Sequence, residues 1–154
     1  MSLVFAIRTI NGNFLTAVNA GGIGEPANKW AIHTDATQIG PWERFRLIKA
    51  EEGLFAIQTS NGRYLTAVNG GGMGEAANKL PIHTDAKRIS TWEKFTLESL
   101  GNNEFAIKTS GGKYLTAVNV GGVGEAANIL PIHSDATKIS IWEKFAFILT
   151  ETPK

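Results

Sequence analysis

Residues 55–97 read FAIQTSNGRYLTAVNGGGMGEAANKLPIHTDAKRISTWEKFTL, and this stretch occurs three times in the chain of 154 residues. Its counterparts are residues 5–47 and 105–147, so the period is 50 residues without insertion or deletion. The three copies are identical in 24 of the 43 aligned columns. A fixed internal period indicates an architecture of equivalent units. We place the three units at residues of about 3–52, 53–102 and 103–150.

Each unit is predicted to contain four short β-strands. In the second unit these strands are residues 55–59, 64–68, 82–86 and 92–97, in which apolar side chains recur at every second position. The pair Asn61-Gly62 suits a hairpin turn, because glycine tolerates the positive backbone angle that such a turn requires. Helices are disfavoured, because glycine and β-branched residues are frequent and the apolar period is two rather than 3.6.

Three four-stranded units give an all-β chain of twelve strands. Three blades are too few for a propeller, which has at least about four, and the end copies lack the atypical sequences that cap a solenoid. We therefore predict a β-trefoil, a single domain spanning residues 1–154 with pseudo-threefold symmetry. The expected core consists of Phe5, Ile7, Leu15, Ala17, Ile32, Phe45 and their equivalents, whose burial contributes about 25 cal/mol per Å².

The motifs Phe-x-Ile, Gly-x-Tyr-Leu-Thr-Ala and Trp-Glu-x-Phe resemble those of the fascin-like β-trefoils, which are related to actin-crosslinking domains. The resemblance covers nearly the whole chain, three times over. It implies the trefoil fold and, as one function, the binding or bundling of actin filaments. Fascins contain four trefoils in series, whereas this chain has one. The Gln-x-Trp motif of ricin-type lectin trefoils is absent.

Composition and charge restrict the partners. The net charge is +1 and the basic residues are scattered, so we expect no nucleic-acid partner. The chain has no cysteine, which leaves the redox compartment undefined. The first residues lack a signal-peptide pattern, and no apolar run is long enough for membrane insertion. A cytoplasmic protein is the default expectation, and secretion by a non-signal route stays open.

A glycine-rich loop between the second and third strands carries the first candidate ligand-binding residues. These are Asn19, Gly22, Glu25 and Asn28, with Asn69, Gly72, Glu75, Asn78, Asn119, Gly122, Glu125 and Asn128 in the other copies. In a purely structural loop, the glycines adopt positive angles and the polar side chains cap the loop backbone. As a binding site, the loop would offer N–H groups, a carboxylate and an amide to the vicinal hydroxyls of a sugar. A phosphate loop is rejected, because the Gly-Lys-Ser/Thr ending and a following helix are missing.

The third strand carries the second candidate set, His33 and Asp35 with His83, Asp85, His133 and Asp135. Residues two apart on a strand share a face, so these side chains point away from the Ile32 face. We expect them to face outward or to line a groove, where Asp35 accepts hydrogen bonds from sugar hydroxyls. Together with the adjacent loop they would form one site per repeat. The alternative is an exposed pair, or a histidine that bonds to a neighbouring carbonyl, without a ligand. Three histidines would suit zinc, but nothing brings these strands to the axis, so no metal or cofactor is predicted.

Trp42, Trp92 and Trp142, each followed by glutamate, are expected to pack in the core where the hairpins close the barrel. The alternative role is a platform on which a sugar ring stacks. The glutamate is expected to accept hydrogen bonds from nearby backbone donors. Trp30 occurs in the first copy alone and cannot belong to a threefold function.

Triplication of every candidate polar group favours binding over catalysis, because chemistry needs different groups in different roles. We therefore predict a non-catalytic, lectin-like protein with up to three equivalent sites and with glycans or glycoconjugates as partners. Three sites on one rigid body raise the avidity for a surface by roughly 10²–10⁴. The alternative is a fascin-like protein that binds actin filaments. The lack of a large basic patch that could meet acidic actin argues against it.

Overall fold

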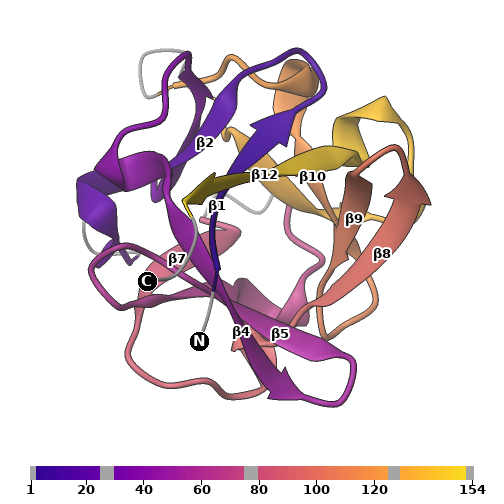
Figure 1. Ribbon diagram of the computed structural model, residues 1–154. Helices are drawn as coiled ribbons and strands as arrows, with labels where there is room; N and C mark the ends of the chain where they lie inside the picture. The colour runs from indigo at the N-terminus through magenta and orange to yellow at the C-terminus, as the bar shows by residue number, and fades with distance from the viewer. Residues whose placement is uncertain (1–2, 25–29, 75–79, 125–128, 152–154) are drawn as a thin grey trace.

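A computed structural model describes residues 3–24, 30–74, 80–124 and 129–151 (Figure 1). The first repeat contains β1 (Val4–Thr9), β2 (Phe14–Ala17), the 3₁₀ turn η1 (Val18–Ala20), β3 (Ile32–Ala36), η3 (Pro41–Glu43) and β4 (Phe45–Glu51). The second contains β5 (Leu54–Gln58), β6 (Tyr64–Ala67), η4 (Val68–Gly70), β7 (Ile82–Ala86), η6 (Thr91–Glu93) and β8 (Thr96–Gly101). The third contains β9 (Glu104–Lys108), β10 (Tyr114–Ala117), η7 (Val118–Val120), β11 (Ile132–Ala136), η9 (Ile141–Glu143) and β12 (Phe145–Glu151). Within these ranges no helix has the length and apolar character needed to cross a membrane.

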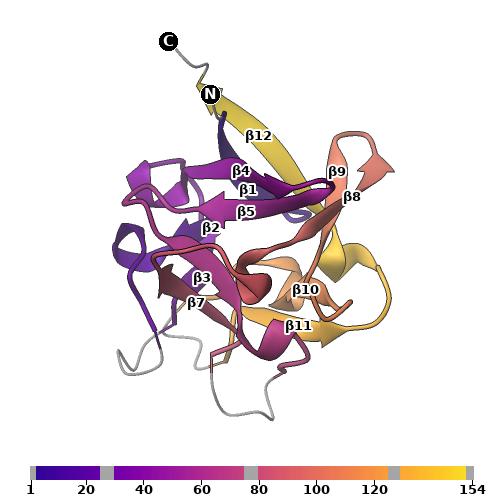
Figure 2. The same cartoon turned by 90° about the horizontal axis from the view of Figure 1, so that it is seen from below.

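The twelve strands of the described chain belong to one antiparallel sheet. Six of them close into a ring in the order β12–β1–β4–β5–β8–β9, in which a bridge between Phe55 and Phe95 joins β5 to the segment leading into β8. The other six form three hairpins, β2–β3, β6–β7 and β10–β11. Figure 2 shows these hairpins as a second layer beneath the ring. A six-stranded ring capped by three hairpins is a β-trefoil, as predicted.

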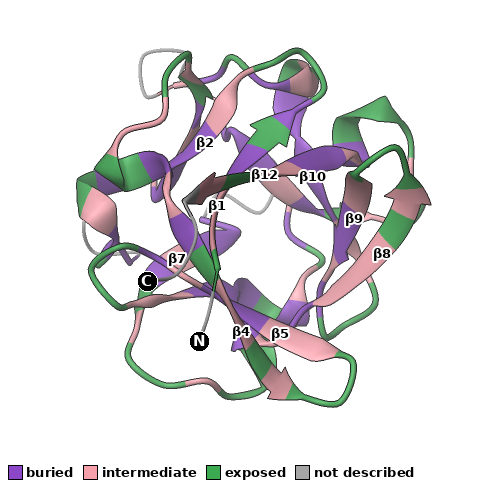
Figure 3. Cartoon of the chain, viewed as in Figure 1, coloured by how far each residue is buried: buried purple, intermediate pink, exposed green. Residues whose placement is uncertain are grey.

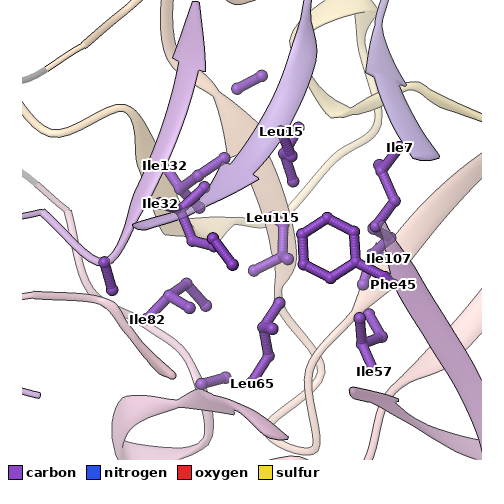
Figure 4. Close-up of a cluster of buried hydrophobic side chains, with 14 of the residues drawn as sticks. Ile7, Leu15, Ile32, Phe45, Ile57, Leu65, Ile82, Ile107, Leu115 and Ile132 are labelled. Carbon is purple, nitrogen blue, oxygen red and sulfur yellow. The ribbon is translucent and has the colours of Figure 1, made fainter. Parts of the chain in front are cut away.

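The core is one cluster of buried side chains inside the ring and between the hairpins (Figures 3 and 4). Each repeat contributes the same residues, and Ile7, Leu15, Ile32, Phe45 and all of their equivalents are at most 3% exposed. Ala17 and its equivalents are buried beside them. The period-two pattern therefore identified these core positions correctly.

Phe5, Phe55 and Phe105 differ from the expectation, because they are only partly buried. The start of β1 lies at the end of the ring remote from the hairpin layer, so no second layer covers it (Figure 2). Phe147 makes edge-on contacts with Phe5 and Phe105 there, at ring-centroid distances of 5.9 and 5.5 Å. Phe5 and Phe105 therefore pack against Phe147, and the more deeply buried Phe45 and its equivalents fill the core.

The predicted fourth strand begins too early, and the tryptophans in it are not in the core. Trp92 and Glu93 lie in the turn η6, and β8 begins only at Thr96. The side chains of Trp42, Trp92 and Trp142 are 43%, 42% and 38% exposed. A 3₁₀ turn places successive side chains about a third of a turn apart, so the glutamate can point inward while the tryptophan points outward. The expectation of core packing for these tryptophans is therefore wrong.

Candidate functional site

Each exposed tryptophan is held by the buried glutamate that follows it. Glu43 is 9% exposed, and its Oε2 accepts a hydrogen bond from Thr16 Oγ1 at 2.5 Å. Its Oε1 accepts a hydrogen bond from the N–H of Gly40 at 2.8 Å. The carboxylate thus ties η3 to β2 and closes the turn that presents Trp42. Hydrogen bonds to carboxylates are among the stronger ones in proteins, so this turn is fixed to the hairpin layer.

The other two repeats contain the same arrangement with one more donor. The Oε1 atoms of Glu93 and Glu143 accept hydrogen bonds from the N–H of Ser90 and Ser140 at 2.9 and 2.8 Å. The Oγ atoms of the same serines donate to these Oε1 atoms at 2.8 and 2.7 Å. Thr66 and Thr116 donate to the Oε2 atoms, each at 2.6 Å. The expected role of the glutamates as acceptors of backbone N–H groups is confirmed.

A second turn lies beside each tryptophan turn and carries an exposed asparagine. η1 packs beside η3, and the same pairing recurs for η4 with η6 and η7 with η9. Asn19, Asn69 and Asn119 are exposed and have φ angles of 60°, 63° and 60°. Asparagine tolerates this left-handed conformation better than most residues do, so its recurrence at this position also has a structural explanation. Each repeat therefore presents an amide and an indole on neighbouring turns.

The histidine and aspartate lie as predicted on the outward face of the third strand. His33 is partly buried and Asp35 is exposed, whereas Ile32 and Thr34 are buried. The same alternation holds for His83 with Asp85 and for His133 with Asp135. His33 stands opposite Thr16 in the β2–β3 pair, and Thr16 binds the glutamate beside Trp42. The histidine strand and the tryptophan turn thus flank the same strand, β2.

The glycine loop of each repeat is bonded to the third strand of another repeat. The N–H of Gly22 donates to the carbonyl of Thr84 at 2.5 Å, and the N–H of Thr84 donates to the carbonyl of Ile23 at 2.8 Å. The equivalent glycine bonds run from Gly72 to Ser134 at 2.6 Å and from Gly122 to Thr34 at 2.5 Å. These glycine N–H groups are used within the protein and are not available to a ligand.

The aspartates belong to the same junctions between repeats. Gly24 lies against the carboxylate of Asp85, Gly74 against that of Asp135, and Gly124 against that of Asp35. A side chain on any of these three glycines would collide with the carboxylate. At its glycine end, each loop therefore meets the aspartate of a different repeat, whereas a site built within one repeat was expected.

Six of the predicted ligand-binding residues lie outside the described residues: Glu25, Asn28, Glu75, Asn78, Glu125 and Asn128. A ligand role for them stays a prediction. Among the described residues, no group of three or more histidine, aspartate or glutamate side chains is placed to hold a metal ion.

The tryptophans are the residues that the period-two pattern misplaced. A signal for the correct assignment is present in the sequence: Ser90 and Ser140 are each followed three residues later by glutamate. This Ser-x-x-Glu spacing is the capping box, which begins a helical turn and not a strand. In the first repeat Gly40 replaces the serine, which weakens the signal there.

Comparison with known proteins supports the fold. No protein-family model matches the chain, and no curated protein matches its sequence. Solved structures do match: a designed threefold-symmetric protein, ThreeFoil, has a TM-score of 0.74 at 12% identity, with coverage of 94% of this chain and 97% of that one. The Rhizoctonia solani agglutinin has a TM-score of 0.69 at 14% identity, with coverage of 97% and 96%.

A third match is SeviL, solved bound to asialo-GM1 saccharide. Its TM-score is 0.64 at 12% identity, and the match covers 98% of this chain and all of that one. At such identities these matches establish the β-trefoil fold alone. They carry nothing specific to fascins.

Proposed function

We propose that this protein binds glycans without catalysis, through one tryptophan-centred site on each repeat. The observation that carries the proposal is the recurrence of an exposed tryptophan, 38–43% exposed, at the same position of all three repeats. Single exposed apolar residues are common on protein surfaces and need no explanation. Here the large indole is presented three times by a turn that a buried glutamate fixes in place.

The surroundings of the indole suit a sugar. An aromatic face packs against the C–H face of a pyranose, while polar groups around it bind the hydroxyls. Asn19 supplies an exposed amide on the neighbouring turn, and His33 lies on the strand that pairs with β2. An amide both donates and accepts, as recognition of a hydroxyl requires. We extend the same assignment to the Asn69 and Asn119 sites.

Proteins of similar fold support the proposal, because one of the matching structures is an agglutinin and another is bound to a saccharide. Their low identity limits this support to the fold, and the tryptophan sites are argued from this chain alone. Triplication adds a physical reason. A shallow sugar site with a Kd near 1 mM corresponds to about −4 kcal/mol, and three such sites on one body raise the avidity for a glycan surface.

A glycan array tests the proposal with four proteins. The wild type is compared with the triple variant Trp42→Ala, Trp92→Ala, Trp142→Ala. The matched control is Trp30→Leu, because the other repeats have leucine at that position. A further triple variant replaces the loop glutamates, Glu25→Ala, Glu75→Ala, Glu125→Ala.

We expect the wild type and Trp30→Leu to bind the same glycans and the triple tryptophan variant to lose them. If the folded wild type binds no glycan on the array, the proposal of glycan binding is overturned. A protein partner would then be the next candidate, because exposed tryptophans also suit protein interfaces. Binding that survives the loss of the three tryptophans but not of the three glutamates would move the sites to the glycine loops.

A further inference from the structure

Two surface pockets occupy equivalent positions between successive repeats. The Arg44 pocket, of about 180 Å³, is lined by Val4, Pro41, Arg44, Phe45, Arg46 and Ser60. The Lys94 pocket, of about 300 Å³, has Thr91, Lys94, Thr96 and Ser110 at the corresponding positions, with Glu51 and Lys108 in addition. The two pockets share one architecture, so their differences in charge can be compared directly.

The cations of the Lys94 pocket are neutralised. Lys94 Nζ lies 2.9 Å from Glu51 Oε2, and Lys108 Nζ lies 3.6 Å from Glu98 Oε2. The Arg44 pocket has two arginines and no carboxylate among its described lining residues. In the described part of the chain, neither Arg44 nor Arg46 forms an ion pair. Among the described side chains, the two arginines of the first pocket therefore have no carboxylate partner, whereas the two lysines of the second pocket each have one.

Arg44 also has a donor without an acceptor. Its Nε atom is buried and makes no hydrogen bond to any described residue. The great majority of buried polar groups in native proteins are paired, and an unpaired one costs stability. Arg44 also lines the pocket, so an acceptor bound there would lie beside this guanidinium. The unmet donor therefore points to an acceptor that the described residues do not supply.

We propose that the Arg44 pocket binds a carboxylate or sulfate group. The planar guanidinium of arginine matches the two oxygens of such a group, and the Ser60 hydroxyl adds a third donor at the rim. The volume is below the 300–1,000 Å³ of sites for whole drug-sized ligands, so it suits a charged group with part of a sugar ring. Pro41 lines the pocket and precedes Trp42 in η3. An acidic saccharide bound in the pocket could therefore also contact Trp42.

The two arginines belong to the first repeat, and Ser60 comes from the second. The anion site does not depend on the tryptophan sites. At Arg44 the other repeats have lysine, and at Arg46 they have Thr96 and Ala146. Glu151 stands opposite Val4 in β12, as Glu51 stands opposite Leu54 in β4. The side chain of Glu151 lies outside the described part of the structure, and the test therefore includes this residue.

The test is a titration of the ¹⁵N-labelled protein at low ionic strength, followed by the NMR signal of the Arg44 Nε–H. The probes are sodium sulfate, methyl glucuronide and, as the neutral control, methyl glucoside. We expect saturable shifts with both anions in the millimolar range and none with the glucoside. Tighter binding of the glucuronide would identify an acidic saccharide as the natural ligand, and tighter binding of sulfate would identify a free inorganic oxyanion.

The variant Arg44→Lys, Arg46→Thr carries the residues of the second repeat and is expected to fold. Shifts of the neighbouring Ser60 amide report binding to it, and we expect about tenfold weaker binding of both anions. The control Lys94→Gln, Lys108→Gln should bind as the wild type does. The proposal is overturned if no anion saturates the signal, if the double arginine variant binds equally well, or if binding appears only after Glu151→Gln.

Discussion

Glu93 receives three hydrogen bonds, from the N–H and Oγ of Ser90 and from Oγ1 of Thr66, at 2.9, 2.8 and 2.6 Å. At 5% exposure it is among the most buried charged residues of the described chain. It links the turn that presents Trp92 to the hairpin layer. This glutamate, which was expected from the sequence to accept backbone hydrogen bonds, thus also joins its turn to β6.

We expect Glu93→Ala to lower the free energy of unfolding by about 2–4 kcal/mol, because it leaves three partly buried donors without their acceptor. Urea unfolding measures the change. The control is Glu52→Ala, whose side chain is 97% exposed and whose replacement should change stability by less than about 0.5 kcal/mol. Equal effects of the two variants would contradict the structural role of Glu93.

Val120 has a φ of 65°, a conformation that a β-branched residue rarely adopts. The second repeat has Gly70 at this position, with a φ of 74°. Such strain costs about 1–3 kcal/mol. Glycine removes the strain, but it loses more conformational entropy on folding, which costs about 0.5–1 kcal/mol. We therefore expect Val120→Gly to raise the melting temperature and to stabilise the protein by about 1 kcal/mol. A loss of stability would show that contacts of the valine side chain outweigh the strain.

At the scale of elements, the glycine loop joins two repeats through hydrogen bonds and close contacts. Gly72 donates to Ser134, and the N–H of Ser134 donates to the carbonyl of Met73 at 2.8 Å. The next glycine, Gly74, lies against Asp135. The identity of the described glycines Gly72 and Gly74 among the repeats therefore has a structural origin, and a glycine-rich motif is not by itself a binding motif.

This junction between repeats predicts an energetic coupling between Gly74 and Asp135, which lie 61 positions apart in the sequence. Gly74→Ala places a methyl group against the Asp135 carboxylate, and we expect it to cost about 1–3 kcal/mol. Asp135→Ala removes the obstacle, so the double variant should recover at least half of that loss. A double-mutant cycle of unfolding free energies measures this coupling. Strictly additive effects would mean that this glycine and this carboxylate do not meet.

The strands, the hairpin turns and the central core positions could be predicted from the sequence, because alternation and glycine placement act locally. Trp92 could not be placed in the same way, since a short 3₁₀ turn interrupts the alternation without changing residue types strongly. The partner of each loop could not be predicted either. Asp35, Asp85 and Asp135 are identical in type and context, and only the closed ring decides which of them each loop meets.

At the scale of the whole molecule, pseudo-threefold symmetry gives three similar faces that are not identical. The residue before each tryptophan is Pro41, Thr91 or Ile141, and Ile141 is 55% exposed. The sites are therefore expected to rank ligands differently while sharing the indole. The Arg44 pocket lies on the first face, where Arg46 takes the place of Thr96 and Ala146.

The most direct test of the tryptophan sites is fluorine NMR of the protein labelled with 5-fluorotryptophan. The glycan with the strongest array signal is titrated, and the four resonances are assigned with single Trp→Phe variants. The resonances of Trp42, Trp92 and Trp142 should shift saturably, whereas that of Trp30 should stay unchanged. Saturable binding of the glycan that leaves all three of these resonances in place would contradict the account.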